Sequence, residues 1–323
     1  MKRLISTVLM AASLGLWSHS LAAQNYPSRP ITVVVPFPAG GSVDGVARIL
    51  VQNLNQIPGW AAIVENRAGG AGGTVGANTV AKAAPDGYTL MLTASVNAIN
   101  PLLFKNLPYD FVNDFTPITL LATGPLLVSA PPTLPVKNLK EFFDLVRKDQ
   151  QKYTFGHTSP GSASHLAMEL LKRDAKLDTL IIAYKGTAPA LNDLMGGTIH
   201  LLADPMLSSL PLAQGGKTKA LAVTSLKRMA AAPDVPTVEE AGMKGFELVS
   251  WYGVWGPKGL PADVTAKLQS EMSKIIKQPD VTQRLLTIGF EPVGSTADEF
   301  SKYIKDEMAK YDQIIKAANI QLN

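Results

Sequence analysis

A short apolar strand, a glycine turn and a helix follow one another directly near the start of this chain. The β-branched run Ile31–Val35 predicts a buried strand. Gly40 and Gly41 allow a tight turn because they carry no Cβ, and Ser42 or Asp44 can cap the helix that follows. The free N–H groups and the dipole of such a helix start form a site for an anion.

The glycine spacing of this unit matches neither the dinucleotide-binding pattern nor the phosphate-binding P-loop. The segment by itself therefore indicates either an anion site or an ordinary turn between a strand and a helix. The rest of the chain has to distinguish these two interpretations.

The same kind of unit recurs further along the chain. Residues 159–165 form a second glycine- and serine-rich turn before a helix, and Thr187–Pro189 is a third helix start, with proline near its first position. The alternation of strands and helices predicts mostly parallel sheets flanked by helices. Helix starts in both halves of the chain indicate two α/β lobes facing a cleft, because ligands of open α/β sheets bind outside the carboxyl ends of the strands.

Two extended segments, near Thr119–Ala130 and Ser250–Gly256, predict crossovers between the lobes. We expect residues 24–122 together with 251–323 to form lobe 1 and residues 123–250 to form lobe 2. The helical C-terminal region then returns to lobe 1.

The first 23 residues have the pattern of a secretory signal peptide. Lys2 and Arg3 precede an apolar stretch that is too short to span a bilayer, and small residues before Ala23 or Gln24 offer a cleavage site. No later stretch approaches 18 uninterrupted apolar residues. We expect export to the periplasm without membrane insertion. Because the chain has no cysteine, it has no disulfide, lipid anchor or thiolate chemistry.

The charge argues against two classes of partner. Removal of Lys2 and Arg3 from the 30 basic residues leaves 28 against 26 acidic ones, a net charge of about +2. Basic residues do not cluster or interleave with aromatic ones, so neither nucleic acid nor a membrane surface is an expected partner.

An enzyme is the main competing class. Besides His19 in the expected signal peptide, the histidines are His157, His165 and His200, and no zinc-protease, esterase or cysteine-cluster motif is present. His157, Ser159 and Asp204 can be drawn as a hydrolase constellation, but the turn after Ser159 is not a nucleophile elbow. We therefore expect no catalytic residue, no metal and no cofactor.

Five segments together resemble the Bug-type extracytoplasmic solute receptors, the binding components of tripartite tricarboxylate transporters. The resemblance covers essentially the whole mature chain, in order. The five segments are Phe37–Asp44, Val64–Gly73, Ala84–Leu90, Tyr184–Leu194 and Pro233–Gly242.

The resemblance implies a monomeric, two-lobe Venus-flytrap protein that captures a small carboxylate and works with the membrane components of a transporter. Ligands of the family include dicarboxylates, tricarboxylates, acidic amino acids and aromatic acids. In the family, amides and hydroxyls from both lobes hold one carboxylate. The corresponding residues are Phe37, Gly40, Gly41, Ser42, Asp44, Ser95 and Asn97 in lobe 1, and Ser159, Ser162, Ser164, His165, Thr187, Ala188 and Asp204 in lobe 2.

Some of these residues also have a structural interpretation. For Asp44 we favour a capping role, because its charge would repel a carboxylate ligand. For the ring of His165 we favour packing against the sheet, with Ser162 and Ser164 as better ligand candidates. The sequence departs from the common family pattern at His157–Pro160 and Ala203–Pro205, where specificity is expected to be set, so the identity of the carboxylate stays open.

Overall fold

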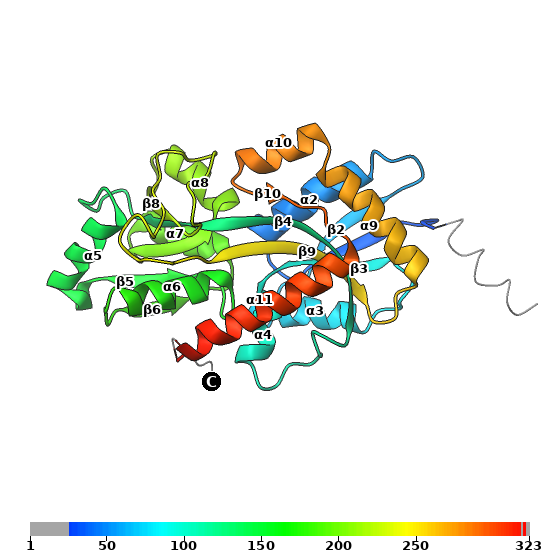
Figure 1. Ribbon diagram of the computed structural model, residues 1–323, viewed down its shortest axis with the longest axis horizontal. Helices are drawn as coiled ribbons and strands as arrows, with labels where there is room; N and C mark the ends of the chain where they lie inside the picture. The colour runs from blue at the N-terminus through cyan, green and yellow to red at the C-terminus, as the bar shows by residue number, and fades with distance from the viewer. Residues whose placement is uncertain (1–25, 318, 321–323) are drawn as a thin grey trace, which may run out of the picture.

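The computed structural model describes residues 26–317, 319 and 320. The expected signal peptide lies outside the described residues. Two groups of strands, one in each half of an elongated molecule, form the sheet framework (Figure 1). In lobe 1 the strand order is β2 (Ala62–Asn66), β1 (Ile31–Val35), β3 (Thr89–Ala94), β9 (Val249–Pro257) and β4 (Phe115–Ala130), with β10 (Glu291–Pro292) also on β4. In lobe 2 the order is β4, β7 (Leu201–Pro205), β5 (Thr154–His157) and β6 (Leu180–Ala183), with β8 (Lys219–Val223) also on β4.

Helices cover the faces of both groups of strands. Those of the first part of the chain are α2 (Ser42–Leu54), α3 (Thr74–Ala81), α4 (Val96–Leu103), α5 (Leu139–Lys148) and α6 (Ala163–Asp174). The remaining ones are α7 (Thr187–Gly196), α8 (Met206–Gln214), α9 (Ala262–Ile276), α10 (Pro279–Thr287) and α11 (Ala297–Ala317), and the short 3₁₀ helices are η2 (Ala71–Gly73) and η3 (Gln150–Lys152).

The strands β4 and β9 connect the lobes. The first part of β4 pairs with β9 from Phe115 to Pro125, and its last part pairs with β7 and β8. The outer strands β1, β2 and β3, and likewise β5, β6 and β7, are parallel, as their strand–helix–strand order predicts. Each antiparallel pairing among the described strands involves β4 or β9.

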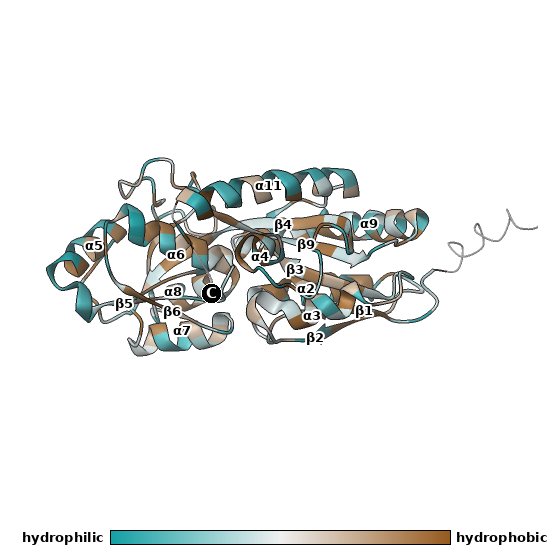
Figure 2. Ribbon diagram, turned by 90° about the horizontal axis from the view of Figure 1, so that it is seen from below, coloured by the Kyte–Doolittle hydropathy of each residue, from teal (hydrophilic) through white to brown (hydrophobic). Residues whose placement is uncertain are grey.

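The C-terminal helix α11 lies along both lobes (Figure 2). Phe300 near its start packs with Trp251 and Trp255, whereas Tyr311 and Ile315 near its end belong to the core of lobe 2. Trp251 Nε1 donates a hydrogen bond of 3.0 Å to the Tyr311 hydroxyl. The helix therefore supports the crossover strands from behind.

Two helices have no counterpart in the sequence-based prediction. Helices α4 and α8 are short and contain Pro101 and Pro211 respectively, and proline inside a helix removes one hydrogen bond and weakens the helical pattern. The extended segment expected near Thr119–Ala130 is the strand β4, which begins four residues earlier, at Phe115. We retain residues 24–122 plus 251–323 and residues 123–250 as the proposed limits of the lobes.

Candidate functional site

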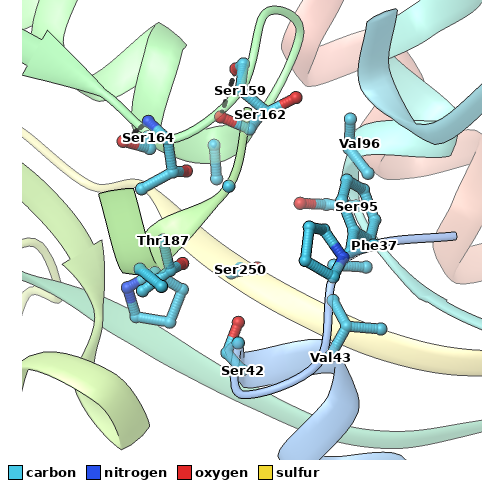
Figure 3. Close-up of a pocket in the computed structure, with 18 of the residues that line it drawn as sticks. Phe37, Ser42, Val43, Ser95, Val96, Ser159, Ser162, Ser164, Thr187 and Ser250 are labelled. Carbon is cyan, nitrogen blue, oxygen red and sulfur yellow. Dashed lines mark hydrogen bonds between the residues drawn. The ribbon is translucent and has the colours of Figure 1, made fainter. Parts of the chain in front are cut away.

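A cavity lies between the two lobes and encloses about 680 Å³ of empty space, including the part open to solvent. Figure 3 shows Phe37 and Ser42 on one side of it and Ser159, Ser162, Ser164 and Thr187 on the other. The lining residues are Phe37, Pro38, Ala39, Gly41, Ser42, Val43, Ala94, Ser95, Val96, Leu126, Thr158, Ser159, Ser162, Ala163, Ser164, Gly186, Thr187, Ala188, Pro189, Pro205, Ser250 and Tyr252.

The starts of several helices meet at this cavity. Helices α2, α4, α6 and α7 each contribute their first residues to the lining, and Pro205 immediately precedes α8. Each of these helices follows directly after a strand, namely β1, β3, β5, β6 and β7. The carboxyl ends of the strands therefore aim five helix N-termini, with their free N–H groups and partial positive charge, at one space.

The start of α2 leaves its backbone N–H groups free. Its N-cap residue is Gly41, at φ −84° and ψ 174°, and no side chain forms a capping hydrogen bond. The Asp44 carboxylate instead accepts hydrogen bonds from the Gly40 N–H at 2.9 Å, Arg48 Nε at 2.8 Å and Asn66 Nδ2 at 3.0 Å. Burial raises the pKa of Asp44, but these three hydrogen bonds outweigh burial and hold the pKa below its usual value. Asp44 is thus ionised and braces the turn, which leaves the cavity side of the turn to backbone amides.

The lobe 2 wall is held by hydroxyl groups. Ser162 Oγ accepts from the His165 N–H at 3.2 Å, which caps α6, and donates to the Ser159 carbonyl at 2.7 Å. Ser164 Oγ donates to the Ala203 carbonyl at 2.5 Å. Helix α7 begins after Gly186 without a side-chain cap, so the N–H groups of its first turn face the cavity without an internal acceptor.

The lining of the cavity carries no cationic side chain among the described residues. Among the described residues that line it, none is Lys, Arg, His, Asp or Glu. Attraction of an anion therefore depends on helix dipoles, backbone N–H groups and hydroxyls.

The two lobes touch at the rims of the cavity. A Cβ placed on Gly186 would lie 3.7 Å from Pro38 Cδ, and one placed on Gly45 of α2 would lie 3.0 Å from Cδ2 of Leu207 in α8. These positions bring residues of the proposed lobe 1 close to residues of the proposed lobe 2 beside the cavity.

Nine of the site residues expected from the sequence line the cavity: Phe37, Gly41, Ser42, Ser95, Ser159, Ser162, Ser164, Thr187 and Ala188. Gly40, Asp44, Asn97, His165 and Asp204 do not line it. The N–H of Gly40 is occupied by Asp44, and the buried Asn97 accepts from Thr93 Oγ1 at 3.0 Å. The His165 ring packs on His157, with ring centroids 4.3 Å apart, and its Nδ1 accepts from the Gly161 N–H.

The crossover strand β9 contributes lining residues that the sequence-based prediction did not include. Ser250 and Tyr252 line the cavity, whereas Trp251 between them packs toward α11. This alternation follows from the two-residue period of a strand. The period could have identified Ser250 and Tyr252 once one face of β9 was known to face the cleft.

The residues that could suggest a hydrolase do not form a triad. Ser159 Oγ donates to the Pro160 carbonyl at 3.4 Å, and Asp204 Oδ1 accepts from Thr187 Oγ1. The buried His157 Nδ1 has no hydrogen-bond partner in the described part of the chain. Burial, followed by the nearby His165, lowers the pKa of His157 to about 3, so this ring is a poor general base at neutral pH.

Residues 26–317, 319 and 320 contain no group of three or more His, Cys, Asp or Glu side chains placed to hold a metal ion. None of their helices combines the length and apolar character needed to cross a membrane.

Known proteins resemble this chain over nearly its whole length. The profile of the tripartite tricarboxylate transporter family receptors, TctC, matches residues 46–320. BugT of Bordetella pertussis is 31% identical over 325 residues, which cover 100% of this chain and 99% of BugT.

Solved structures share the fold closely. The periplasmic binding protein BugD has 38% identity and a TM-score of 0.87, over 92% of this chain and 99% of BugD. R. palustris Rpa4515, solved with adipate, has 33% identity and a TM-score of 0.89 over 92% of this chain and 99% of its own. MatC of Rhodopseudomonas palustris, solved with bound malate, has 34% identity and a TM-score of 0.84 over 90% of this chain and 100% of its own. The chain therefore belongs to the tripartite tricarboxylate transporter family receptors, and within them it is a Bug-type protein with the two-lobe fold of the periplasmic binding proteins.

Proposed function

We propose that this protein captures a small carboxylate in the periplasm and delivers it to the membrane components of a tripartite transporter, without catalysing a reaction. The observation that supports this proposal most strongly is the meeting of five helix starts at a cavity whose described lining residues carry no ionisable acid or base apart from the Tyr252 hydroxyl. Such a cavity favours an anion but offers no nucleophile activated by a base.

The ligand carboxylate bridges the two lobes. The N–H groups of Ser42 and Val43 at the start of α2 hold it from lobe 1, and those of Thr187 and Ala188 at the start of α7 hold it from lobe 2. Closure excludes water, and each charge-assisted hydrogen bond then contributes roughly 1.5–3 kcal/mol. A ligand that contacts both lobes stabilises the closed form, which is the form that the membrane partner recognises.

The relatives support the class of ligand. Rpa4515 was solved with adipate and MatC with malate, and both of these ligands are small carboxylates. We propose the same class here: a dicarboxylate, tricarboxylate, acidic amino acid or aromatic acid. The first 23 residues act as a cleaved signal peptide, and the mature protein acts as a monomer.

Isothermal titration calorimetry with malate, adipate, citrate, glutamate and benzoate tests the class, with glucose as an uncharged control. We expect binding of at least one carboxylate and none of glucose. At a concentration of 100 times Kd, the bound ligand should stabilise the protein by about 2.7 kcal/mol.

The Gly41→Val variant tests the anchor. A Cβ at Gly41 would meet only the Pro38 carbonyl, at 3.8 Å, and the extended backbone there suits valine, so the variant should fold. The valine side chain would cover the amides at the start of α2. We expect the affinity for the carboxylate to fall at least about 100-fold, because two charge-assisted hydrogen bonds would be lost.

Gly196→Val is the matched control, because Gly196 is exposed at the far end of α7 with no atom within 4 Å of the added Cβ. It should bind like the wild type. Unchanged affinity in a folded Gly41→Val protein would refute the anchor. Turnover of a model ester, together with no binding of any carboxylate, would favour the hydrolase that uses His157 and Ser159.

A further inference from the structure

A buried carboxyl group lies directly behind the cavity wall. Asp204 is 1% exposed and sits at the end of β7, one residue before the lining residue Pro205. Its Oδ1 accepts a hydrogen bond of 2.9 Å from Oγ1 of Thr187, a lining residue at the start of α7. Its Oδ2 is buried and has no hydrogen-bond partner among the described residues. A buried carboxyl oxygen without a partner, one residue from a cavity wall, requires a physical explanation.

Among the described residues, no cation lowers the pKa of this carboxyl group by its charge. The residues that line the adjacent cavity include no Lys, Arg or His within the described chain. Burial raises the pKa of Asp204 to about 8, and the Thr187 hydrogen bond opposes this only in part. A carboxyl group in such surroundings is held as the neutral acid at pH 7.

Tyr252 of β9, which lines the cavity, is a titratable group close enough to Asp204 to feel its charge. Burial raises the pKa of Tyr252 well above its ordinary value, and the charge of an ionised Asp204 would raise it further. The Ser42 and Ser250 hydroxyls lie close enough to oppose that rise. At pH 7 the Tyr252 phenol and the Ser42 and Ser250 hydroxyls of the lining therefore all carry O–H groups that can donate a hydrogen bond to an anion.

We propose that Asp204 acts as a carboxylic acid in this cavity and restricts its ligands to carboxylates that carry no ammonium group. This inference rests on the proposed function and narrows it, since it removes acidic amino acids from the ligand classes. Oδ2 carries the proton and Oδ1 keeps the Thr187 hydrogen bond, so that no negative charge lies behind the wall against which the ligand carboxylate binds.

Two physical arguments support this assignment. An ionised Asp204 would place a second negative charge beside the bound carboxylate, and two like charges in a water-poor site cannot both remain ionised at low cost. An ammonium group would need the ionised form, and it would also meet the positive ends of five helices. Above the pKa of Asp204, binding of a carboxylate must therefore take up one proton from solvent.

Malate and aspartate are matched probes, because they differ by a hydroxyl in place of an ammonium group. Calorimetry from pH 6 to 9.5 should show that malate binds at least tenfold more tightly than aspartate at pH 7. Malate affinity should be constant below about pH 8 and fall about tenfold per pH unit above it. Adipate, which also lacks an ammonium group, should follow the same profile.

The Asp204→Asn variant retains an N–H donor at the position of the acid and cannot ionise. It should bind malate within about tenfold of the wild type and lose the fall above pH 8. If this variant instead loses binding altogether, or if aspartate binds more tightly than malate, Asp204 is an ionised partner of an ammonium group and the inference is wrong.

A ligand-free measurement separates this inference from the proposed function. The folded-state pKa of Asp204 is raised, so its stabilising effect is complete below pH 4 and is lost as the pH rises to about 8. The melting temperature of the wild type should therefore fall relative to that of Asp204→Asn over this range. If the difference between the two melting temperatures is constant over this range, the inference is wrong even if no probe binds. If this difference grows with pH but no carboxylate binds, only the proposed function is refuted.

Discussion

The helix starts at the cavity differ from helix starts on the outer surface of the molecule. At the cavity, α2 and α7 begin after Gly41 and Gly186 without a side-chain cap. On the surface, α5 begins with Asn138, whose Oδ1 accepts from the Glu141 N–H at 2.9 Å. The start of α11 has a complete capping box, in which Thr296 Oγ1 accepts from the Glu299 N–H and the Glu299 carboxylate accepts from the Thr296 N–H.

This difference shows where the chain uses its backbone N–H groups for stability and where it leaves them for a ligand. A side-chain cap typically contributes about 1 kcal/mol. Helices α2 and α7 forgo this contribution, whereas α6 at the same cavity is capped by Ser162. Absence of a cap alone does not identify a site, because α9 and α10 also begin without one. What identifies the site is the convergence of several free helix starts on one cavity.

The largest effect is expected when a helix start at the cavity is given a side-chain cap like those of the surface helices. In Gly41→Asn the new side chain accepts from the free N–H groups of α2, which the ligand would otherwise use. We expect the free energy of ligand binding to become less favourable by about 1.5–3 kcal/mol. The free energy of unfolding should rise by about a few tenths of a kcal/mol. Calorimetry and urea unfolding measure the two changes, and a rise in affinity would contradict the account.

The second prediction concerns the histidines beneath the lobe 2 wall. Burial lowers the pKa of His157 to about 3 and that of His165 to about 4, whereas both should titrate near 6.5 when unfolded. The unfolded chain then binds more protons at low pH, so stability is complete above pH 6.5 and is lost as the pH falls toward 4. We expect about 2 kcal/mol of destabilisation per histidine at pH 5.

Urea unfolding at pH 7 and pH 5 measures this loss. His157→Phe keeps an aromatic ring against His165 but cannot be protonated, so it should lose less stability between the two pH values than the wild type. Equal losses in the two proteins would show that His157 is not responsible.

Removal of the side-chain cap from a surface helix should have the smallest effect. Asn138→Ala deletes the side-chain acceptor at the start of α5, and we expect the free energy of unfolding to fall by about 1 kcal/mol. Ligand affinity should not change, because Asn138 is not among the cavity residues. A tenfold loss of affinity would mean that the surface helix starts are coupled to the site.

The sequence predicted the parts of the site that have a local signal. Glycine, serine and proline at the starts of α2, α6 and α7 identify these helix N-termini from neighbouring residues alone. Helices α4 and α8 escaped prediction because an internal proline masks a short helix. The sequence also indicated the two extended crossover segments, which correspond to β4 and β9.

Tertiary contacts decided the remaining residues. Asn97 resembles a ligand residue in the sequence, but it turns inward to Thr93, and Tyr252 enters the site only because Trp251 packs against α11. The partner of each side chain depends on elements distant in the chain, and sequence periodicity does not encode such pairings.

The central claim is that free N–H groups from both lobes bind the same carboxylate. Amide NMR of the ¹⁵N-labelled protein, titrated with a carboxylate that binds in calorimetry, tests this claim most directly. We expect large chemical-shift changes of the Ser42 and Val43 amides in lobe 1 and of the Thr187 and Ala188 amides in lobe 2. The chemical shift of the Glu141 amide, which is bonded to its cap, should not change. Shifts confined to one lobe, or equal shifts at Glu141, would contradict the central claim.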